Sequence, residues 1–347
     1  MIYFNCDYNE GGHPNILESL LKTNLEQTPG YGEDYHCEHA RELIRKACGA
    51  ESAGVHFLEG GTQANFTVIR AALRPHQGVI SPATGHINVH ETGAVEATGH
   101  RILAVPGGTE GKLTANQVDE LCAEHFEGPM PREHMVQPKM VYISQPTENG
   151  ALYSKEELTA LRRVCDKWDL FLFADGARLG YGLTSKAADF TLPDMAEFCD
   201  VFVIGGTKCG ALFGEAVVIT NPALDKDFRY AIKQNGGMLA KGRLLGIQFE
   251  TLFTDELYLN ICEKANRLAE KIADACSAAG VPEYAPSPTN QRFFIFPNEA
   301  LKKLTEQYTF TVWEKTDASH TAVRICTSWA TTEENVEALI QDIRAVR

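Results

Sequence analysis

The chain has 347 residues, of which 44% are hydrophobic and 22% charged, the balance of a globular protein large enough for two domains. The formal net charge of −14 argues against nucleic acid as a main partner, because proteins bind phosphate backbones through basic surfaces. No apolar stretch approaches the roughly 20 residues that span a bilayer, so we expect no membrane segment.

Strands and helices are predicted to alternate over the first 245 residues. Strands are expected at residues 54–58, 78–80, 101–105, 139–144, 170–174 and 201–204, and helices at residues 40–48, 63–73, 114–124 and 155–168. Thr62 is predicted to cap the second helix, and Ser154 with Glu157 forms a capping box before the fourth. The last two strands are wholly apolar, as strands covered on both faces are. The pattern predicts a mainly parallel sheet with helices on both sides, in a large domain over residues 1–245.

The character of the chain changes after Gly246. We expect a long helix at about residues 252–279, strands at residues 292–296 and 322–326, and a closing helix from Thr332. Residues 282–289, rich in proline and serine, separate the long helix from the first of these strands. We therefore predict a smaller C-terminal domain over residues 246–347.

The cysteines and the first residues indicate the cellular compartment. The ten cysteines are scattered and none forms a C-x-x-C pair, so we expect reduced, mostly buried thiols. Residues 1–7 lack a basic segment followed by an apolar run, which argues against a signal peptide. Both observations predict a cytoplasmic protein.

Two predicted strands lead to side chains that can carry chemistry. Residues 170–174 run into Asp175, and residues 201–204 lead through two glycines to Lys208. Because ligands of open α/β sheets bind beyond the carboxyl ends of the strands, both side chains should reach the same edge. Alone, the aspartate would be a turn residue and the lysine a solvated one. Together they fit pyridoxal phosphate (PLP), since a lysine amine forms a Schiff base with its aldehyde and a carboxylate keeps its pyridine nitrogen protonated.

PLP also needs a phosphate cradle, for which residues 59–65 are the candidate. This Glu-Gly-Gly-Thr-Gln-Ala-Asn segment lies between a predicted strand and a predicted helix, where glycines let backbone N–H groups approach a phosphate. It matches neither the P-loop nor the dinucleotide-binding pattern, which argues against an NTPase and a nicotinamide dehydrogenase. A plain strand-to-helix turn would have the same sequence features.

His86 follows the short predicted strand at residues 78–80. A structural histidine with satisfied hydrogen bonds would explain its position equally well. The functional alternative is an aromatic face that stacks on the cofactor ring, with a titratable nitrogen beside it. The other histidines show no spacing typical of a metal site, so we expect no metal.

Six segments form a recognisable series along the chain. They are Tyr31-Gly32-Glu33-Asp34, residues 61–65, residues 85–94, Asp175-Gly176-Ala177-Arg178-Leu179, residues 237–243 and residues 323–329. In this order they resemble the threonine aldolase/β-eliminating lyase family of fold-type-I PLP enzymes, in particular its low-specificity and phenylserine-aldolase branch. The resemblance covers nearly the whole chain. It implies the aspartate-aminotransferase fold, in which a large domain with a mainly parallel seven-stranded sheet carries a small C-terminal α/β domain.

The resemblance also implies roles at the cofactor. Lys208 would form the Schiff base, Asp175 would pair with the pyridine nitrogen, and His86 would stack on the ring. Gly61 and Thr62 would bind the phosphate. The remaining residues that the resemblance places at the cofactor are Thr207 and Lys241.

For the substrate, the resemblance implies that Arg178 and Arg324 hold the carboxylate, and two guanidinium forks suit such a planar anion. Cys6 stands where the family usually has a serine that touches the same carboxylate. Tyr31 and Lys241 would come from the neighbouring subunit of a homodimer or homotetramer, because the family's sites lie at a dimer interface.

The implied reaction is retro-aldol cleavage of a β-hydroxy-α-amino acid, of the L-threonine, L-allo-threonine or phenylserine type, to glycine and an aldehyde. Many threonine aldolases carry Glu-Asn-Thr-His after the central strand, whereas residues 144–147 here read Ser-Gln-Pro-Thr. That histidine is absent, so His86 is our candidate for the catalytic base. β-Elimination from a cysteine-like or aromatic amino acid is the alternative, since it could use the same residues. A non-catalytic PLP-binding protein is a third reading, against which the intact residue set argues.

Overall fold

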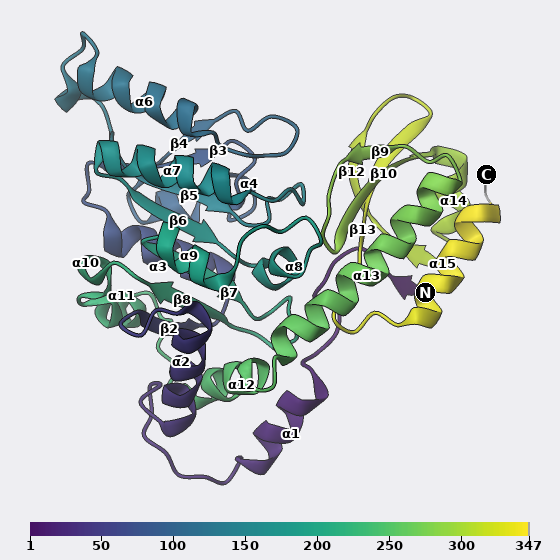
Figure 1. Ribbon diagram of the computed structural model, residues 1–347, viewed down its shortest axis with the longest axis horizontal. Coiled ribbons are helices and arrows are strands. Elements are labelled where there is room, and N and C mark those ends of the chain that lie inside the picture. The colour runs from purple at the N-terminus through teal and green to yellow at the C-terminus, as the bar shows by residue number, and fades with distance from the viewer. Residues whose placement is uncertain (346–347) are drawn as a thin grey trace.

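A seven-stranded sheet forms the centre of the computed structural model, which describes residues 1–345 (Figure 1). In sheet order the strands are β2 (Gly54–Leu58), β8 (Glu215–Ile219), β7 (Val201–Gly205), β6 (Phe171–Asp175), β5 (Gln137–Ser144), β3 (Gln77–Pro82) and β4 (Arg101–Val105). The strands from β7 through β6, β5 and β3 to β4 are parallel, whereas β8 is antiparallel to both β7 and β2. The predicted mainly parallel sheet is confirmed.

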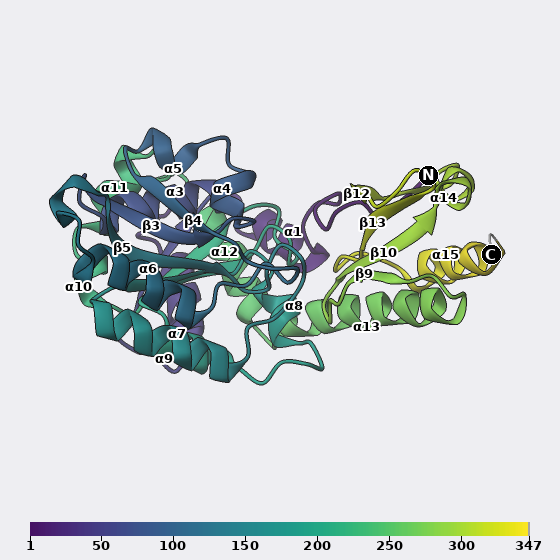
Figure 2. The ribbon, with the colours of Figure 1, turned by 90° about the horizontal axis from the view of Figure 1, so that it is seen from above.

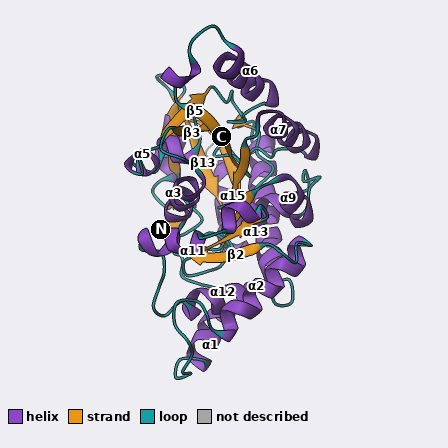
Figure 3. Cartoon of the chain, turned by 90° about the vertical axis from the view of Figure 1, so that its left-hand side faces the viewer, coloured by secondary structure: helices purple, strands orange, loops and turns teal. Residues whose placement is uncertain are grey.

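Helices cover both faces of this sheet, because its strands are apolar on both sides (Figures 2 and 3). Ile143 and Leu172 pack into the core beneath helices such as α2 and α7, while Tyr142 and Phe173 pack into the core on the opposite side, beneath α3. The helices of this domain are α1 (Pro14–Lys22), α2 (Tyr35–Cys48), α3 (Gly61–Ala72), α4 (His86–Val89), α5 (Ala94–Ala97), α6 (Ala115–Glu127), α7 (Lys155–Trp168), α8 (Leu179–Leu183), α9 (Leu192–Phe198), α10 (Pro222–Asp225), α11 (Phe228–Gln234) and α12 (Arg243–Phe253), with a 3-10 turn at Arg132–His134.

The predicted cap of α3 is wrong. Gly60, in extended backbone, is the N-cap residue, no side chain caps the helix, and Thr62 is already its second residue. The capping boxes at Thr114 and Ser154 show the contrast, since there the cap hydroxyl accepts a backbone N–H of the first turn. The first N–H groups of α3 are therefore left without a side-chain acceptor.

The long helix expected at residues 252–279 is confirmed except at its start, where residues 252 and 253 belong to the preceding helix. α12 ends at Phe253, and α13 (Leu257–Ala278) begins after a break in which Asp255 and Glu256 have φ values of 51° and 57°. Left-handed backbone cannot continue a right-handed helix, so the chain changes direction there. α12 packs against α2 in the large domain, whereas α13 runs along the small domain (Figure 2).

The small domain is built from both ends of the chain (Figure 1). Its antiparallel sheet has the order β12 (Thr311–Lys315), β13 (His320–Cys326), β10 (Gln291–Pro297) and β9 (Glu283–Ala285), with α14 (Asn298–Leu304) and α15 (Glu333–Ala345) beside it. β1 (Ile2–Tyr3) pairs in parallel with β11 (Tyr308–Thr309), and Phe4 is buried among residues of α13 and α15. The segment after Phe4 therefore passes from the small domain to the large one.

All ten cysteines are free and buried, as predicted. Burial raises the pKa of thiols such as Cys48, to about 12, which keeps them protonated and unreactive. Within residues 1–345, no helix combines the length and the apolar character that a membrane crossing needs.

Candidate active site

A cavity of about 580 Å³ lies at the carboxyl ends of β3, β5, β6 and β7, where ligands of open α/β sheets bind. Eight of the residues singled out from the sequence line it: Gly61, Thr62, His86, Asp175, Arg178, Thr207, Lys208 and Arg324. A larger groove, of about 1180 Å³, runs along α13, but none of the predicted site residues lines it. The smaller cavity is therefore the candidate active site.

Asp175 is the last residue of β6 and is 5% exposed. Its Oδ2 accepts hydrogen bonds from the Asn65 amide (2.8 Å) and the Tyr142 hydroxyl (2.7 Å), and its Oδ1 accepts from the Ala177 N–H (2.9 Å). Burial opposes ionisation, but the nearby His86 and these hydrogen bonds hold the pKa of the carboxyl below its usual value. The edge of the sheet thus carries an ionised carboxylate that can pair with a protonated ring nitrogen.

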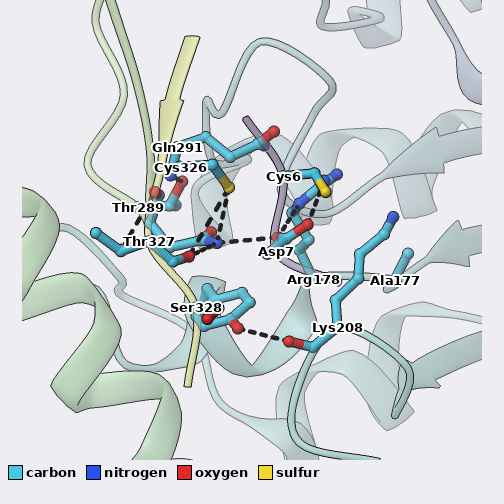
Figure 4. A network of polar contacts seen from close by, with 12 residues as sticks. Cys6, Asp7, Ala177, Arg178, Lys208, Thr289, Gln291, Cys326, Thr327 and Ser328 are labelled. Carbon is cyan, nitrogen blue, oxygen red and sulfur yellow. Dashed lines mark hydrogen bonds and ion pairs between the residues drawn. The ribbon is translucent and has the colours of Figure 1, made fainter. Parts of the chain in front are cut away.

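Lys208 lies in the loop after β7 with its side chain in the cavity (Figure 4). The Tyr181 hydroxyl donates to the Lys208 carbonyl at 2.6 Å, which holds the backbone, while no group of the described chain hydrogen-bonds the amine. Burial and the charge of Arg178 lower the pKa of this amine. A lowered pKa leaves more of the amine neutral and able to attack an aldehyde.

Near Lys208 lies Glu215, which the sequence did not single out. Its Oε2 accepts the backbone N–H of Gly206 at 3.1 Å. Burial raises the pKa of this carboxyl to about 7. The first residue of β8 is therefore a carboxyl group at the edge of the cavity that titrates near neutral pH.

His86 begins the short helix α4 and belongs to a network of polar side chains. Its Nδ1 lies 2.7 Å from Glu91 Oε1, and the Asn65 amide donates to both Glu91 and Asp175 at 2.8 Å. A ring nitrogen of His86 and one carboxylate oxygen each of Glu91 and Asp175 lie within 4.8 Å of one another. Burial works against protonation of His86, but the bond to Glu91 and the charge of Asp175 raise its pKa. His86 therefore keeps its proton to higher pH than an exposed histidine.

The start of α3 borders the cavity. A Cβ atom added at Gly60 or Gly61 would meet no other heavy atom within 4 Å, so the backbone faces open space there. The N–H groups of the first turn lack a side-chain cap, and the positive end of the helix dipole favours an anion. The Thr62 hydroxyl makes no hydrogen bond to the described chain. An uncapped helix start, a free amine and an ionised carboxylate in one cavity fit the phosphate, aldehyde and ring nitrogen of PLP.

Arg178 is engaged by a partner that the sequence did not reveal. Its Nε and Nη2 donate to the two carboxylate oxygens of Asp7, at 2.7 and 2.9 Å (Figure 4). Asp7 also accepts from the Asn290 amide at 2.9 Å. Asp7 is fully buried. Burial raises the pKa of its carboxyl, but the Arg178 charge outweighs this effect and holds the pKa well below its usual range. Arg178 therefore reaches the cavity in a fixed orientation, and no group of residues 1–345 accepts a hydrogen bond from its Nη1.

Arg324, on β13, lines the cavity from the small domain. Its Nη1 donates to Gln291 Oε1 at 3.0 Å and its Nη2 to the Asn5 carbonyl at 2.9 Å, and the guanidinium lies 5.7 Å from the centre of the Trp313 ring. These contacts hold Arg324, the second residue predicted to bind the substrate carboxylate, in a fixed orientation. The two arginines come from different domains, so a carboxylate bound between them would link the domains.

Three predicted site residues do not line this cavity. The Cys6 thiol is buried and donates to Asn9 Oδ1 at 3.2 Å. The Tyr31 N–H donates to the carbonyl of Ala240, at 3.2 Å, which places Tyr31 beside Lys241. The side chains of Tyr31 and Lys241 are exposed.

The cavity also contains Glu148, which sequence reasoning missed. It follows directly after the stretch at residues 144–147 in which a histidine was sought. Glu91 lies within residues 85–94, one of the segments that carry the family resemblance, but the sequence assigned no role to it. Asp7 directly follows Cys6, which was predicted to touch the substrate. Only Asp7 is next to a predicted site residue, so position along the sequence was at best a weak signal for these three carboxylates.

The fold and this cavity together define a PLP enzyme of the aspartate-aminotransferase fold type. The chain belongs to the beta-eliminating lyase family, whose sequence profile matches residues 7–299. It is 30% identical over 356 aligned residues to a low-specificity L-threonine aldolase of Pseudomonas aeruginosa, covering 99% of this chain and 97% of that one. A structure of Leishmania major threonine aldolase is 40% identical, with 100% of both chains covered and a TM-score of 0.97. An aspartate aminotransferase mutant of Thermus thermophilus, 17% identical with a TM-score of 0.70 over 100% of this chain and 92% of its own, shares the fold.

Proposed function

We propose that this protein is a PLP-dependent aldolase that cleaves a β-hydroxy-α-amino acid, of the L-threonine, L-allo-threonine or phenylserine type, to glycine and an aldehyde. The observation that carries the proposal is one cavity with a buried amine, an ionised carboxylate and two oriented guanidinium groups. Similarity to threonine aldolases over the whole chain supports this reaction above others that the same cofactor allows.

Three residues are proposed to bind the aldehyde, the pyridine nitrogen and the ring of the cofactor. When bound, PLP supplies an electron sink for the bond that breaks at Cα. Lys208 anchors its aldehyde, Asp175 holds a proton at the pyridine nitrogen, and His86 covers the ring. The residues proposed for the phosphate are Gly61, Thr62 and Thr207, with Lys241 of a second copy of the chain.

The two arginines position the substrate in this proposal. Arg178 and Arg324 hold the α-carboxylate, and fixing that group fixes the direction of the Cα–Cβ bond. Cleavage of that bond requires an acceptor for the β-hydroxyl proton. His86 is the acceptor suggested by the sequence, and a general base of this kind contributes about 10²–10⁴-fold to the rate.

We further propose that the working unit is a homodimer, or a dimer of dimers, in the cytoplasm. Tyr31 and Lys241 support shared sites, because both side chains are exposed and neither lines the cavity of its own chain. The buried free thiols of all ten cysteines support a reducing compartment.

Product analysis distinguishes this proposal from β-elimination. The PLP-loaded protein is incubated with L-threonine, L-allo-threonine or L-phenylserine, and we expect glycine with acetaldehyde or benzaldehyde in equal amounts. The Lys208→Ala variant, as the control, should form no aldehyde above background. Pyruvate and ammonia from L-cysteine, with no aldehyde from any hydroxy amino acid, would overturn the proposal in favour of a β-eliminating lyase.

A further inference from the structure

Glu148 brings a second carboxylate to the cavity beside His86. It lies in the turn after β5, where the Thr147 N–H donates to the Ala151 carbonyl at 2.8 Å. Its Oε1 accepts the backbone N–H of His86 at 2.8 Å and the hydroxyl of Ser144 at 2.6 Å. No group of residues 1–345 hydrogen-bonds Oε2, and the side chain lines the cavity. One oxygen is thus fixed by protein donors and the other is left for a ligand.

Glu148 differs from Asp7 and Glu91 in having no cationic partner. Asp7 pairs with Arg178, and Glu91 pairs with His86, but no basic side chain in the described part of the chain forms an ion pair with Glu148. Burial raises the pKa of the Glu148 carboxyl, and the hydrogen bond from Ser144 only partly offsets this effect. A carboxylate that is oriented but not neutralised has a higher proton affinity than one held in an ion pair.

The surroundings of His86 make it the poorer proton acceptor. The Glu91 carboxylate accepts from Nδ1, and Asp175 lies close by, so the imidazole is stabilised in its charged form. In its charged form, which these contacts favour, an imidazole has no free lone pair to accept a further proton. The ionised carboxylate of Glu148, in contrast, has free lone pairs that can accept a proton.

We propose that Glu148 is a further catalytic residue, whose Oε2 accepts the β-hydroxyl proton of the substrate as the Cα–Cβ bond breaks. This inference rests on the proposed aldol cleavage. The O–H bond breaks, its electron pair forms the aldehyde carbonyl, and the electron pair of the Cα–Cβ bond remains with Cα. A proton then adds to Cα, so glycine and the aldehyde together contain the atoms of the substrate. The step needs no water, oxidant or reductant.

The Glu148→Gln variant tests this role, because glutamine keeps an acceptor for the His86 N–H and the Ser144 hydroxyl but is not a base. Three quantities are measured: L-threonine cleavage, exchange of the glycine α-proton in D₂O by NMR, and PLP affinity by absorbance titration. Exchange in glycine involves no β-hydroxyl. We expect cleavage to fall roughly 10²–10⁴-fold, with exchange and PLP affinity close to those of the wild type.

Glu110→Gln is the matched control, since Glu110 is exposed and its carbonyl accepts the Thr147 hydroxyl at 2.7 Å, beside the same turn. It should change none of the three quantities. Ser144→Ala removes a donor that lowers the pKa of Glu148, so the acid limb of kcat/KM should move to higher pH. In Glu148→Gln the acid limb of kcat/KM should no longer show the ionisation of Glu148.

Two outcomes for Glu148→Gln would overturn the inference: cleavage at the wild-type rate, or an equal fall in cleavage and glycine exchange. The second would give Glu148 a role in positioning the cofactor or the amino acid. Failure of the proposed function has a separate signature. There the wild type itself would exchange the glycine α-proton but release no aldehyde from L-threonine, and both proposals would fall.

Discussion

Replacing Asp7 with asparagine removes the charge that neutralises Arg178 while the side chain keeps its size. The pair is buried, with the Asp7 side chain fully covered and that of Arg178 only 13% exposed. Removing one partner of a buried ion pair costs about 3–5 kcal/mol, because the other charge is left uncompensated. Asparagine can still accept one hydrogen bond from the guanidinium, so we expect the free energy of unfolding to fall by about 3 kcal/mol, the lower end of this range.

The side chains of Asp7, Arg178 and Asn290 together connect the two domains. Asp7 belongs to the segment that leaves the small domain, Arg178 precedes α8 of the large domain, and Asn290 precedes β10. The pKa of Asp7 is depressed in the folded protein. Its contribution to stability is therefore present above the ordinary carboxyl pKa, about 3.9, and is lost as the pH falls toward the lower folded value. At pH 7 the full effect of the substitution should be seen.

Urea unfolding followed by circular dichroism, at a fixed excess of PLP, measures this loss as a lower midpoint. Asp119→Asn is the control, because Asp119 is a surface carboxylate that binds Lys167, and it should leave the midpoint nearly unchanged. We also expect KM for the amino acid to rise in Asp7→Asn, since Arg178 loses its fixed orientation. An Asp7→Asn protein within about 0.5 kcal/mol of the wild type, the range of a neutral surface change, would refute the reasoning.

Three further predictions concern the cofactor and the subunit interface. Borohydride reduction and peptide mapping should find the cofactor on Lys208 in the wild type and on no lysine in Lys208→Ala; a label elsewhere would contradict the assignment. Asp175→Asn should lose roughly 10²-fold or more in cleavage, because a neutral amide cannot hold the ring proton, and wild-type turnover would exclude that role. Subunit exchange between Lys208→Ala and Lys241→Ala should restore about a quarter of wild-type activity, since half of the dimers would be hybrids with one intact site of two. No recovery would place Lys241 in the site of its own chain.

The central sheet could be predicted because its strands are short apolar runs between helical segments. Residues 201–204 and 170–174 have no polar position, and such runs suit only strands buried on both faces. The break between α12 and α13 was missed because it depends on two left-handed residues, Asp255 and Glu256, which the helical periodicity around them conceals. α12 turns back to pack on α2, a tertiary contact that local sequence does not contain.

The candidate site was predictable to the extent that it lies at strand ends. Asp175 and Lys208 follow directly from that rule, and the structure brings both to one cavity. The partners of these residues could not be predicted in the same way. Asn65 reaches Asp175 across 110 positions of the chain and Asp7 reaches Arg178 across 171, so only the folded chain shows these contacts.

Turnover of uniformly carbon-13-labelled L-threonine by the PLP-loaded protein, followed by NMR, tests most directly whether the Cα–Cβ bond is the one that breaks. The account predicts labelled glycine and labelled acetaldehyde in equal amounts, and neither product with Lys208→Ala. A labelled 2-oxo acid that retains all the carbons of the substrate, formed with ammonia and without labelled glycine, would show that this bond survives and would contradict the account.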